Sequence, residues 1–344
     1  MMLMKVRKLM KLDTTLCFDD ILLKPQISDI KSRKEVDISS SLGYYRFRLP
    51  IISSPMDTVT ESEMSEAIAR SGGFGIVHRY NTIEEQVSII SSTERNIGAA
   101  IGVTGDFLER AKALVEAGCF ILCIDVAHGH HQNVKTALET LKQEMSSETI
   151  LMAGNVATSA AFRDLEDWGA DVIRVGVGGG SICSTIIQTG HGVPTLQSVL
   201  DCAQVAKTAK IVADGGIKTA GDIVKCLAAG ADFVMLGSLL AGTDEAPGQI
   251  FHSNEGKKYK VYRGMASVEA QVDWKGAANS LEGVSTTIPY KGSVQDILIE
   301  LSQNVRSGLS YSGCRSIKEF RSKAIFVRQT QAGMRESNTH ILNK

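Results

Sequence analysis

The chain has 344 residues and a net charge of -1, from 37 Lys and Arg against 38 Asp and Glu. This near-neutral charge offers no overall field for nucleic acid or an anionic membrane, so neither is predicted as a partner. Hydrophobic residues make up 43% and Pro occupies only 6 positions, which excludes a disordered or Pro-rich chain. The length fits either two domains or one large α/β barrel.

The N-terminal segment MMLMKVRKLMKL is apolar but carries Lys5, Arg7, Lys8 and Lys11. These charges interrupt any signal-peptide core or membrane span. The chain has 7 cysteines and no CxxC pair, which argues against a disulfide framework or a zinc knuckle. We therefore predict a cytoplasmic, reducing location.

Eight short apolar runs recur along the chain with helix-like segments between them, such as residues 61–72 and 106–118. Continuous apolar runs are typical of parallel strands buried on both faces. Eight such units in series predict the α/β class and a (β/α)₈ TIM barrel forming a single domain over residues 1–344, with a doubly wound sheet as the alternative. The runs are 49–56, 74–78, 97–102, 120–126, 149–156, 172–178, 210–216 and 233–238.

After residue 240 the alternation ends. A polar stretch follows over 251–285, and its part from about 266 to 285 is interpreted as a mobile flap. The segment SVQDILIELSQNVRSGL then predicts a helix. The tail over about 329–344 is polar, and we expect a partner to order it.

Polar residues and glycines gather where the predicted strands end. In a barrel these ends share one face, and active sites are built there. This face is predicted to carry Ser54, His78, Asp125, Asn155, Gly176, Asp214 and Gly237.

The segment from Gly176 to Thr185 reads GVGGGSICST. Its glycines allow tight turns and close approach of the backbone to a ligand, and Ser181 offers a hydroxyl. Cys183 would lie at a strand end as an exposed nucleophilic thiol. The same residues also fit a glycine-rich loop with an incidental cysteine, and the other cysteines are interpreted as packing residues.

Two further strand ends favour a phosphate group. Gly215 and Gly216 follow Asp214, and Ser238 follows Gly237. Barrels commonly bind phosphate at these ends through backbone N–H groups and a helix N-terminus, and Asp214 is placed to accept hydrogen bonds from ribose hydroxyls. A nucleotide is therefore the predicted ligand, although the classical dinucleotide fingerprint is absent. The HGHH segment at 128–131 lacks a carboxylate or cysteine at ligand spacing and is interpreted as a solvated loop.

Together these segments resemble the IMP dehydrogenase/GMP reductase family. The resemblance extends from about Thr15 to His340, and the Gly-Ser-Ile-Cys-x-Thr loop is its most specific part. It rests on FDDILLKP, ISSPMDTVTE, GNVAT, GSICST, TGHGVP, ADGGIK, MLGSLLAGTDEAPG, YRGM and EGV. It implies a (β/α)₈ barrel, assembled as a homotetramer or an octamer, that binds a purine mononucleotide and a nicotinamide cofactor, with Cys183 attacking purine C2 to form a thioimidate.

The two branches of the family differ in features that the sequence displays. Dehydrogenases usually insert a regulatory (CBS) module after the second strand, which is absent here, and carry an Arg-Tyr pair in the flap, whereas residues 266–281 contain neither residue type. KSRKEVDIS and Asp125-Val126-Ala127 are also similar to the reductases. By contrast, ISSPMDTVTE, HGH and the C-terminal segment are similar to the dehydrogenases, and Ile186 replaces an Arg that most members have.

We weight the flap most, because it carries the chemistry that separates the two reactions. The resemblance then implies reduction of GMP to IMP and ammonia by NADPH, and the sequence does not decide between NADPH and NADH. The alternatives are a short IMP dehydrogenase using NAD, with the Thr185–Glu282 pair activating water, and a non-catalytic barrel that binds purine nucleotides.

The resemblance also implies a role for each site residue. The catalytic group is Cys183, Thr185 and Glu282. The nucleotide is assigned to Ser54, Met56, Ser181, Asp214, Gly215, Gly216, Gly237, Ser238, Tyr262, Gly264 and Met265, and the cofactor to Asp125, Val126, Ala127, Asn155 and Thr185. A potassium ion is assigned to backbone carbonyls of Gly176, Gly178 and Cys183, with Glu336 supplied by a neighbouring subunit.

Overall fold

The computed structural model describes residues 13–93, 96–278 and 282–337. Eight parallel strands close into a barrel in chain order, and the last strand pairs with the first, as Val234 lies opposite Ile51. The barrel is therefore confirmed, and the doubly wound alternative is wrong. The strands are β4 Ile51–Ser53, β5 Phe74–Val77, β6 Gly98–Ile101, β7 Ile121–Asp125, β8 Ile150–Val156, β9 Val172–Val175, β10 Lys210–Asp214 and β11 Phe233–Leu236.

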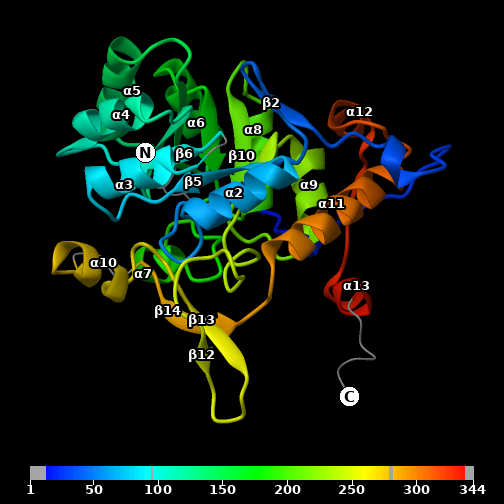
Figure 1. Ribbon diagram of the computed structural model, residues 1–344. Coiled ribbons are helices and arrows are strands. Elements are labelled where there is room, and N and C mark those ends of the chain that lie inside the picture. The colour runs from blue at the N-terminus through cyan, green and yellow to red at the C-terminus, as the bar shows by residue number, and fades with distance from the viewer. Residues whose placement is uncertain (1–12, 94–95, 279–281, 338–344) are drawn as a thin grey trace, which may run out of the picture.

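Helices lie between successive strands and cover the outside of the barrel (Figure 1). Several begin at a threonine whose hydroxyl accepts a backbone N–H three residues on, as Thr82 and Thr158 do, which satisfies a donor that the helix leaves unpaired. The helices are α2 Ser62–Ser71, α3 Ile83–Ser91, α4 Phe107–Glu116, α5 Gln132–Glu144, α6 Ser159–Asp167, α7 Thr185–Thr189, α8 Thr195–Ala203 and α9 Ala220–Ala229. The predicted C-terminal helix is α11, Val294–Ser310, which packs against α2 and α9.

Aromatic side chains fill one end of the barrel. The hairpin of β2 (Ser40–Leu42) and β3 (Tyr45–Phe47) covers this end and inserts Phe47, whose ring centroid lies 4.6 Å from that of Phe74 and 5.8 Å from that of Phe233. Figure 1 shows this hairpin at the opposite end of the molecule from β12, β13 and β14. The end that holds the strands' carboxyl termini is thus left for a ligand.

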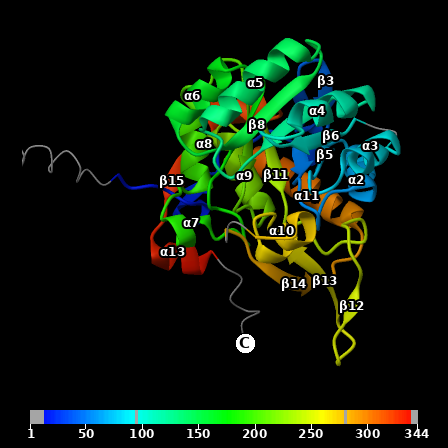
Figure 2. The same ribbon diagram turned by 90° about the vertical axis from the view of Figure 1, so that its left-hand side faces the viewer.

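The stretch after residue 250 is more ordered than its polar sequence predicts. Strands β12 (Phe251–His252), β13 (Lys258–Arg263) and β14 (Ser285–Pro289) form an antiparallel sheet, and helix α10 (Val268–Lys275) lies beside it (Figure 2). The sequence predicted a polar stretch here but did not indicate these strands or this helix. The flap predicted over 266–285 contains α10 and the start of β14, and its residues 279–281 lie outside the described part of the chain.

Two segments far apart in the sequence, β1 (Ile21–Leu23) and β15 (Phe326–Arg328), pair antiparallel. The tail predicted from residue 329 begins with helix α13, Gln331–Glu336, which contacts the short η1 helix, Phe18–Asp20. The remaining elements are η2 Arg33–Glu35 and α12 Ile317–Lys323. Within the described ranges, every helix is too short or too polar to cross a membrane. The charged residues predicted to interrupt the N-terminal segment lie outside those ranges.

Candidate active site

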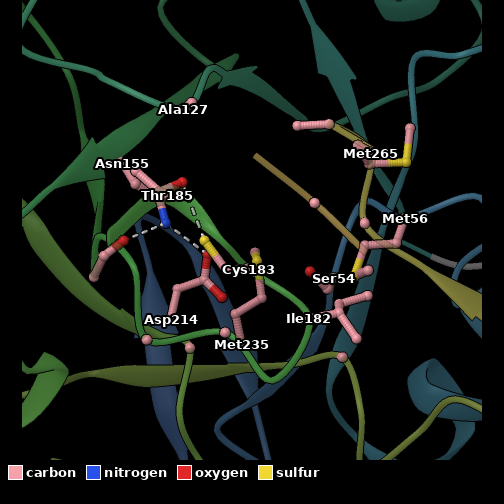
Figure 3. Close-up of a pocket in the computed structure, with 18 of the residues that line it drawn as sticks. Ser54, Met56, Ala127, Asn155, Ile182, Cys183, Thr185, Asp214, Met235 and Met265 are labelled. Carbon is pink, nitrogen blue, oxygen red and sulfur yellow. Dashed lines mark hydrogen bonds between the residues drawn. The ribbon is translucent and has the colours of Figure 1, made fainter. Parts of the chain in front are cut away.

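A pocket of about 330 Å³ opens at the carboxyl ends of the barrel strands. The predicted catalytic, nucleotide and cofactor residues all line it, together with Gly176 and Gly178. In Figure 3, Asn155, Thr185 and Asp214 surround the Cys183 sulfur on one side, and Ser54, Met56 and Met265 lie on the other. Glu336 lies in α13 and does not line this pocket, so its assignment to a neighbouring subunit's cation site stays a prediction.

The glycine-rich loop needs its glycines for close backbone contacts. Gly176 has φ +148°, and a Cβ there would lie 1.8 Å from the carbonyl oxygen of Asp214. Gly215 has φ +97°, and its Cβ would lie 3.1 Å from the amide nitrogen of Gly180. Any side chain at Gly176 would push β9 and β10 apart, so the loop after β9 rests directly on the end of β10.

Cys183, Thr185 and Glu282 form a hydrogen-bonded chain. The thiol of Cys183 lies 3.2 Å from Thr185 Oγ1, and that hydroxyl donates to Glu282 Oε2 at 2.9 Å. The backbone of the segment before β14 holds Glu282 in place, because Ser184 N donates to the Glu282 carbonyl at 3.0 Å and Val284 N donates to that of Ile182 at 3.0 Å. A nucleophile, a hydroxyl relay and a carboxylate thus lie in hydrogen-bond order, as nucleophilic and acid–base chemistry requires.

Arg174 on β9 also lines the pocket and was not among the predicted site residues. It is 5% exposed, and its guanidinium donates to Asp125 Oδ1 at 2.5 Å and to Asp214 Oδ2 at 2.8 Å. Burial opposes the charge of the guanidinium, but the two carboxylates outweigh burial and raise its pKa, so Arg174 remains a cation. The sequence signal that could have found Arg174 is a charged residue within an otherwise apolar predicted strand.

A β-bulge directs Asn155 into the pocket. The pairing of β8 with β9 shifts register between Gly154 and Val156, so Asn155 is an extra residue opposite β9. Asn155 Nδ2 donates to Asp214 Oδ2 and to the carbonyl of Gly176, both at 2.8 Å. Its Oδ1 is buried and has no hydrogen-bond partner among the described residues, so this oxygen fits a ligand that brings a donor.

Neutral groups line the side assigned to phosphate. Tyr262 is 4% exposed and its hydroxyl lies 3.5 Å from Ser181 Oγ, while burial raises the pKa of the phenol. A Cβ at Gly237 would lie 3.1 Å from the Tyr262 hydroxyl and 3.2 Å from Met56 Sδ. These hydroxyls and backbone groups can donate to a phosphate without a lysine among them.

Arginine and tyrosine side chains that follow β5 were not predicted at the pocket. Arg79 and Tyr80 line the pocket, and Arg79 Nε donates to the carbonyl of Asp125 at 3.3 Å. His78, which was predicted on this face, is instead 3% exposed and bonds Glu61 at 3.1 Å. The strand end was located correctly, but the chain turns so that the following two side chains face the pocket.

The remaining histidine and cysteine predictions have mixed outcomes. His128 and His131 are exposed as expected, whereas His130 is only partly exposed and its Nε2 lies 2.7 Å from Asp164 Oδ2. Among the described residues no group of three or more His, Cys, Asp or Glu side chains is arranged to hold a metal ion. Five of the cysteines interpreted as packing residues are buried, whereas the sixth, Cys17, is half-buried at the N-cap of η1.

Comparisons with known proteins point to one family. The sequence model of the IMP dehydrogenase/GMP reductase domain matches residues 15–340. The chain is 38% identical to inosine-5'-monophosphate dehydrogenase of Cryptosporidium parvum, with 94% of each chain covered. It is 33% identical to GMP reductase of Leishmania major, with 96% of this chain and 97% of the relative covered.

A solved structure has the same fold. A cysteine-to-alanine variant of Trypanosoma brucei GMP reductase, in complex with guanosine 5'-monophosphate, superposes with a TM-score of 0.92 at 31% identity, covering 97% of this chain and 99% of that one. The alignment with Leishmania major GMP reductase runs over 479 positions, more than the 344 residues of this chain, so that reductase also has residues that this chain lacks. The shorter length of this chain therefore does not by itself separate reductases from dehydrogenases. The chain belongs to the IMP dehydrogenase/GMP reductase family of oxidoreductases.

Proposed function

We propose that the protein is a GMP reductase that converts GMP and NADPH to IMP, ammonia and NADP⁺. The observation that carries this proposal is the hydrogen-bonded chain from Cys183 through Thr185 to Glu282. It supplies a nucleophile together with a route for a proton. The flap sequence supports the reductive direction, because residues 266–281 contain no Arg or Tyr, the pair that the resemblance assigns to activation of hydrolytic water.

The proposed reaction has two stages. The thiolate of Cys183 adds to C2 of GMP, the C2–N bond breaks, and ammonia departs with a proton delivered through Thr185 and Glu282. The products of this stage are ammonia and a purine held by a C2–S bond. Bound NADPH would supply the hydride that C2 requires. Cys183 then takes back the electron pair of the C–S bond as this bond breaks and IMP leaves.

The pocket residues divide between the two ligands. The nucleotide phosphate is assigned to the Ser181, Gly216, Gly237, Ser238 and Tyr262 region, and the ribose to Asp214. The unpaired Asn155 Oδ1 fits the donor groups of a carboxamide or a ribose hydroxyl, which supports a nicotinamide between Asn155, Asp125 and Thr185. Thr185 then lies between the cofactor and Glu282, where proton delivery is needed.

Two further features of the assignment concern potassium and assembly. Neutral backbone carbonyls at Gly176, Gly178 and Cys183 are a donor set that suits a monovalent cation, although the Gly176 carbonyl already accepts a hydrogen bond from Asn155. Glu336 of a second copy is assigned to complete that site, within a homotetramer or octamer. No step of the proposed reaction passes through the cation.

One pair of assays tests this proposal. The protein is incubated with GMP and NADPH, and separately with IMP and NAD⁺, while the absorbance of the reduced nicotinamide is followed. Loss of absorbance only in the first mixture supports the reductase. Production of reduced cofactor only in the second mixture overturns it in favour of a dehydrogenase.

A short IMP dehydrogenase is the second candidate, favoured by the 38% identity to the Cryptosporidium parvum enzyme. In that reaction the Thr185–Glu282 pair would activate water instead of protonating an amine. If neither mixture reacts but GMP still binds, the protein is a purine-nucleotide-binding barrel without catalysis. Replacing NADPH by NADH in the first mixture identifies the preferred cofactor.

A further inference from the structure

We infer that Arg174 is a positioning residue that holds Asp214 in the orientation needed to read the ribose of the nucleotide. The inference rests on the proposed function, because it takes Asp214 as the ribose acceptor. Arg174 touches neither ligand in this assignment. It acts through the Asp214 carboxylate, which contacts the ribose in this assignment.

The first argument is geometric. Arg174 Nη2 and Asn155 Nδ2 both donate to the same oxygen of Asp214, Oδ2, each at 2.8 Å. Two donors on one oxygen fix the rotation of the carboxylate about its axis. The second oxygen, Oδ1, makes no hydrogen bond to the described residues and is left to accept from ribose hydroxyls.

The second argument is electrostatic. Asp125 and Asp214 converge on one guanidinium, whose other arm bonds Asp125 Oδ1 at 2.5 Å. Arg174 is a buried cation, with 6% of its side chain exposed, against 20% for Asp125 and 14% for Asp214. Without it, two nearby carboxylates in a poorly solvated region would repel each other, and one of them would bind a proton or turn away.

This arrangement requires the planar guanidinium group of arginine. A guanidinium bonds two carboxylates at once in fixed directions, whereas an ammonium is a point charge on a flexible stem. Lysine at this position would keep the charge but lose the simultaneous contact. We therefore predict that arginine at position 174 holds the Asp214 carboxylate best, lysine less well and an apolar residue least.

The test measures discrimination between GMP and 2′-deoxy-GMP by isothermal titration calorimetry, without cofactor. Wild type is expected to bind GMP roughly tenfold more tightly, as for one hydrogen bond to a charged group. In Arg174→Met the preference for GMP over 2′-deoxy-GMP is expected to fall to roughly twofold or less. In Arg174→Lys it is expected to lie between the values of wild type and Arg174→Met. A merely structural role would weaken the binding of GMP and of 2′-deoxy-GMP equally, and the ratio of the two affinities would stay unchanged.

Arg110 provides a matched control. It is also a buried arginine, 4% exposed, and it pairs with Asp106 at 2.8 Å on α4, away from the pocket. Arg110→Met is expected to lower stability but to leave the GMP to 2′-deoxy-GMP ratio at the wild-type value. A ratio that falls equally in both methionine variants would show a general effect of lost stability and overturn the inference.

The remaining outcomes separate the inference from the proposed function. An unchanged ratio in Arg174→Met overturns the inference alone. If Arg174→Met does not fold, Arg174→Lys carries the test, and a wild-type ratio there overturns the inference. Wild type that binds both nucleotides equally overturns the placement of ribose at Asp214, and wild type that binds neither GMP nor IMP overturns the proposed function as well.

Discussion

Burial divides the seven thiols of this chain into two groups. Cys183 and Cys17 are half-buried, whereas Cys119, Cys123, Cys202, Cys226 and Cys314 are buried. Burial raises the pKa of Cys119 and Cys123 to about 12, so these thiols stay protonated and unreactive at neutral pH. A thiol reagent in native buffer is therefore expected to modify two cysteines.

The two accessible thiols are distinguished by variants and by ligand. Cys183→Ala is expected to abolish turnover while GMP binding stays within a few-fold, and GMP is expected to protect only Cys183 from the reagent. Mass spectrometry of the labelled peptides measures the protection, and the reductase assay measures turnover. Cys17→Ala is the control, with wild-type turnover expected; turnover near the wild-type rate in Cys183→Ala would refute covalent catalysis.

Glu282 is expected to act in proton transfer. Glu282→Gln keeps a side chain of the same shape beside Thr185 but removes the ionisable group, so turnover should fall by about 10² to 10⁴. GMP affinity measured by calorimetry should change little. The exposed flap carboxylate Glu269 gives the control variant Glu269→Gln, which is expected to leave turnover unchanged. An equal loss of turnover in the two variants would contradict this role.

The sequence was most informative where a residue's chemistry depends on local chain features. A glycine-rich loop after an apolar strand, both local features, made Cys183 a candidate nucleophile, and the family resemblance then decided between this role and an incidental cysteine. Arg174 was missed because its role depends on Asp125 and Asp214, which come from β7 and β10 and meet it only in the closed barrel. Arg79 was missed because periodicity does not specify how a chain turns after a strand.

At the scale of elements, the contact of the β9 loop with the end of β10 gives a sharp prediction. Gly176→Ala places a Cβ 1.8 Å from the Asp214 carbonyl oxygen, a backbone atom that cannot rotate away. We expect loss of GMP binding and a marked fall in melting temperature. Gly118 also has positive φ, +99°, but no atom lies within 4 Å of its Cβ position.

Gly118→Ala is therefore the matched control. It carries the conformational cost of alanine at positive φ, about 1 kcal/mol, without a steric clash. Its melting temperature should fall slightly and its GMP affinity should equal that of wild type. Wild-type GMP affinity in Gly176→Ala would show that the close approach of the two strand ends is not needed.

Helix α10 shows what could not be predicted at this scale. The ring of Trp274 stacks on Tyr80, with centroids 6.0 Å apart and an interplanar angle of 14°. Arg263 pairs with Asp57 at 2.7 Å and with Asp273 at 2.5 Å. Tyr80 and Asp57 are distant in sequence from the flap, so a flap could be predicted from the sequence but the residues that anchor it could not.

At the scale of the molecule, the barrel was predictable because each strand is buried on both faces and bounded by glycine or polar residues. The outer sheet β12–β13–β14 was not, because its strands are short and largely polar, without the apolar runs that marked the barrel strands. Aromatic filling of the opposite barrel end, through Phe47, likewise depends on a hairpin that the sequence did not indicate. The sequence thus predicts the central barrel better than the segments that close its ends.

The buried thiols also give the whole molecule a pH-dependent stability. The pKa values of Cys119, Cys123 and Cys202 rise from 9.0 to about 12 in the folded protein through burial. Between pH 9 and 12 the unfolded chain therefore loses these thiol protons while the folded protein keeps them. The free energy of unfolding falls as pH rises, by about 1.4 kcal/mol per pH unit for each thiol.

Cys202→Ala tests this effect, because Cys202 lies in α8 outside the pocket. Urea unfolding under reducing conditions is compared between variant and wild type across this alkaline range. Burial lowers the pKa of Lys260 and Lys291, which act with the opposite sign, so the difference between the two proteins is the quantity measured. Below pH 8 that difference should be constant; above pH 9 the variant's stability should fall less steeply, by about 1.4 kcal/mol per pH unit. Parallel curves at all pH values would mean that the Cys202 thiol ionises equally in the folded and unfolded protein.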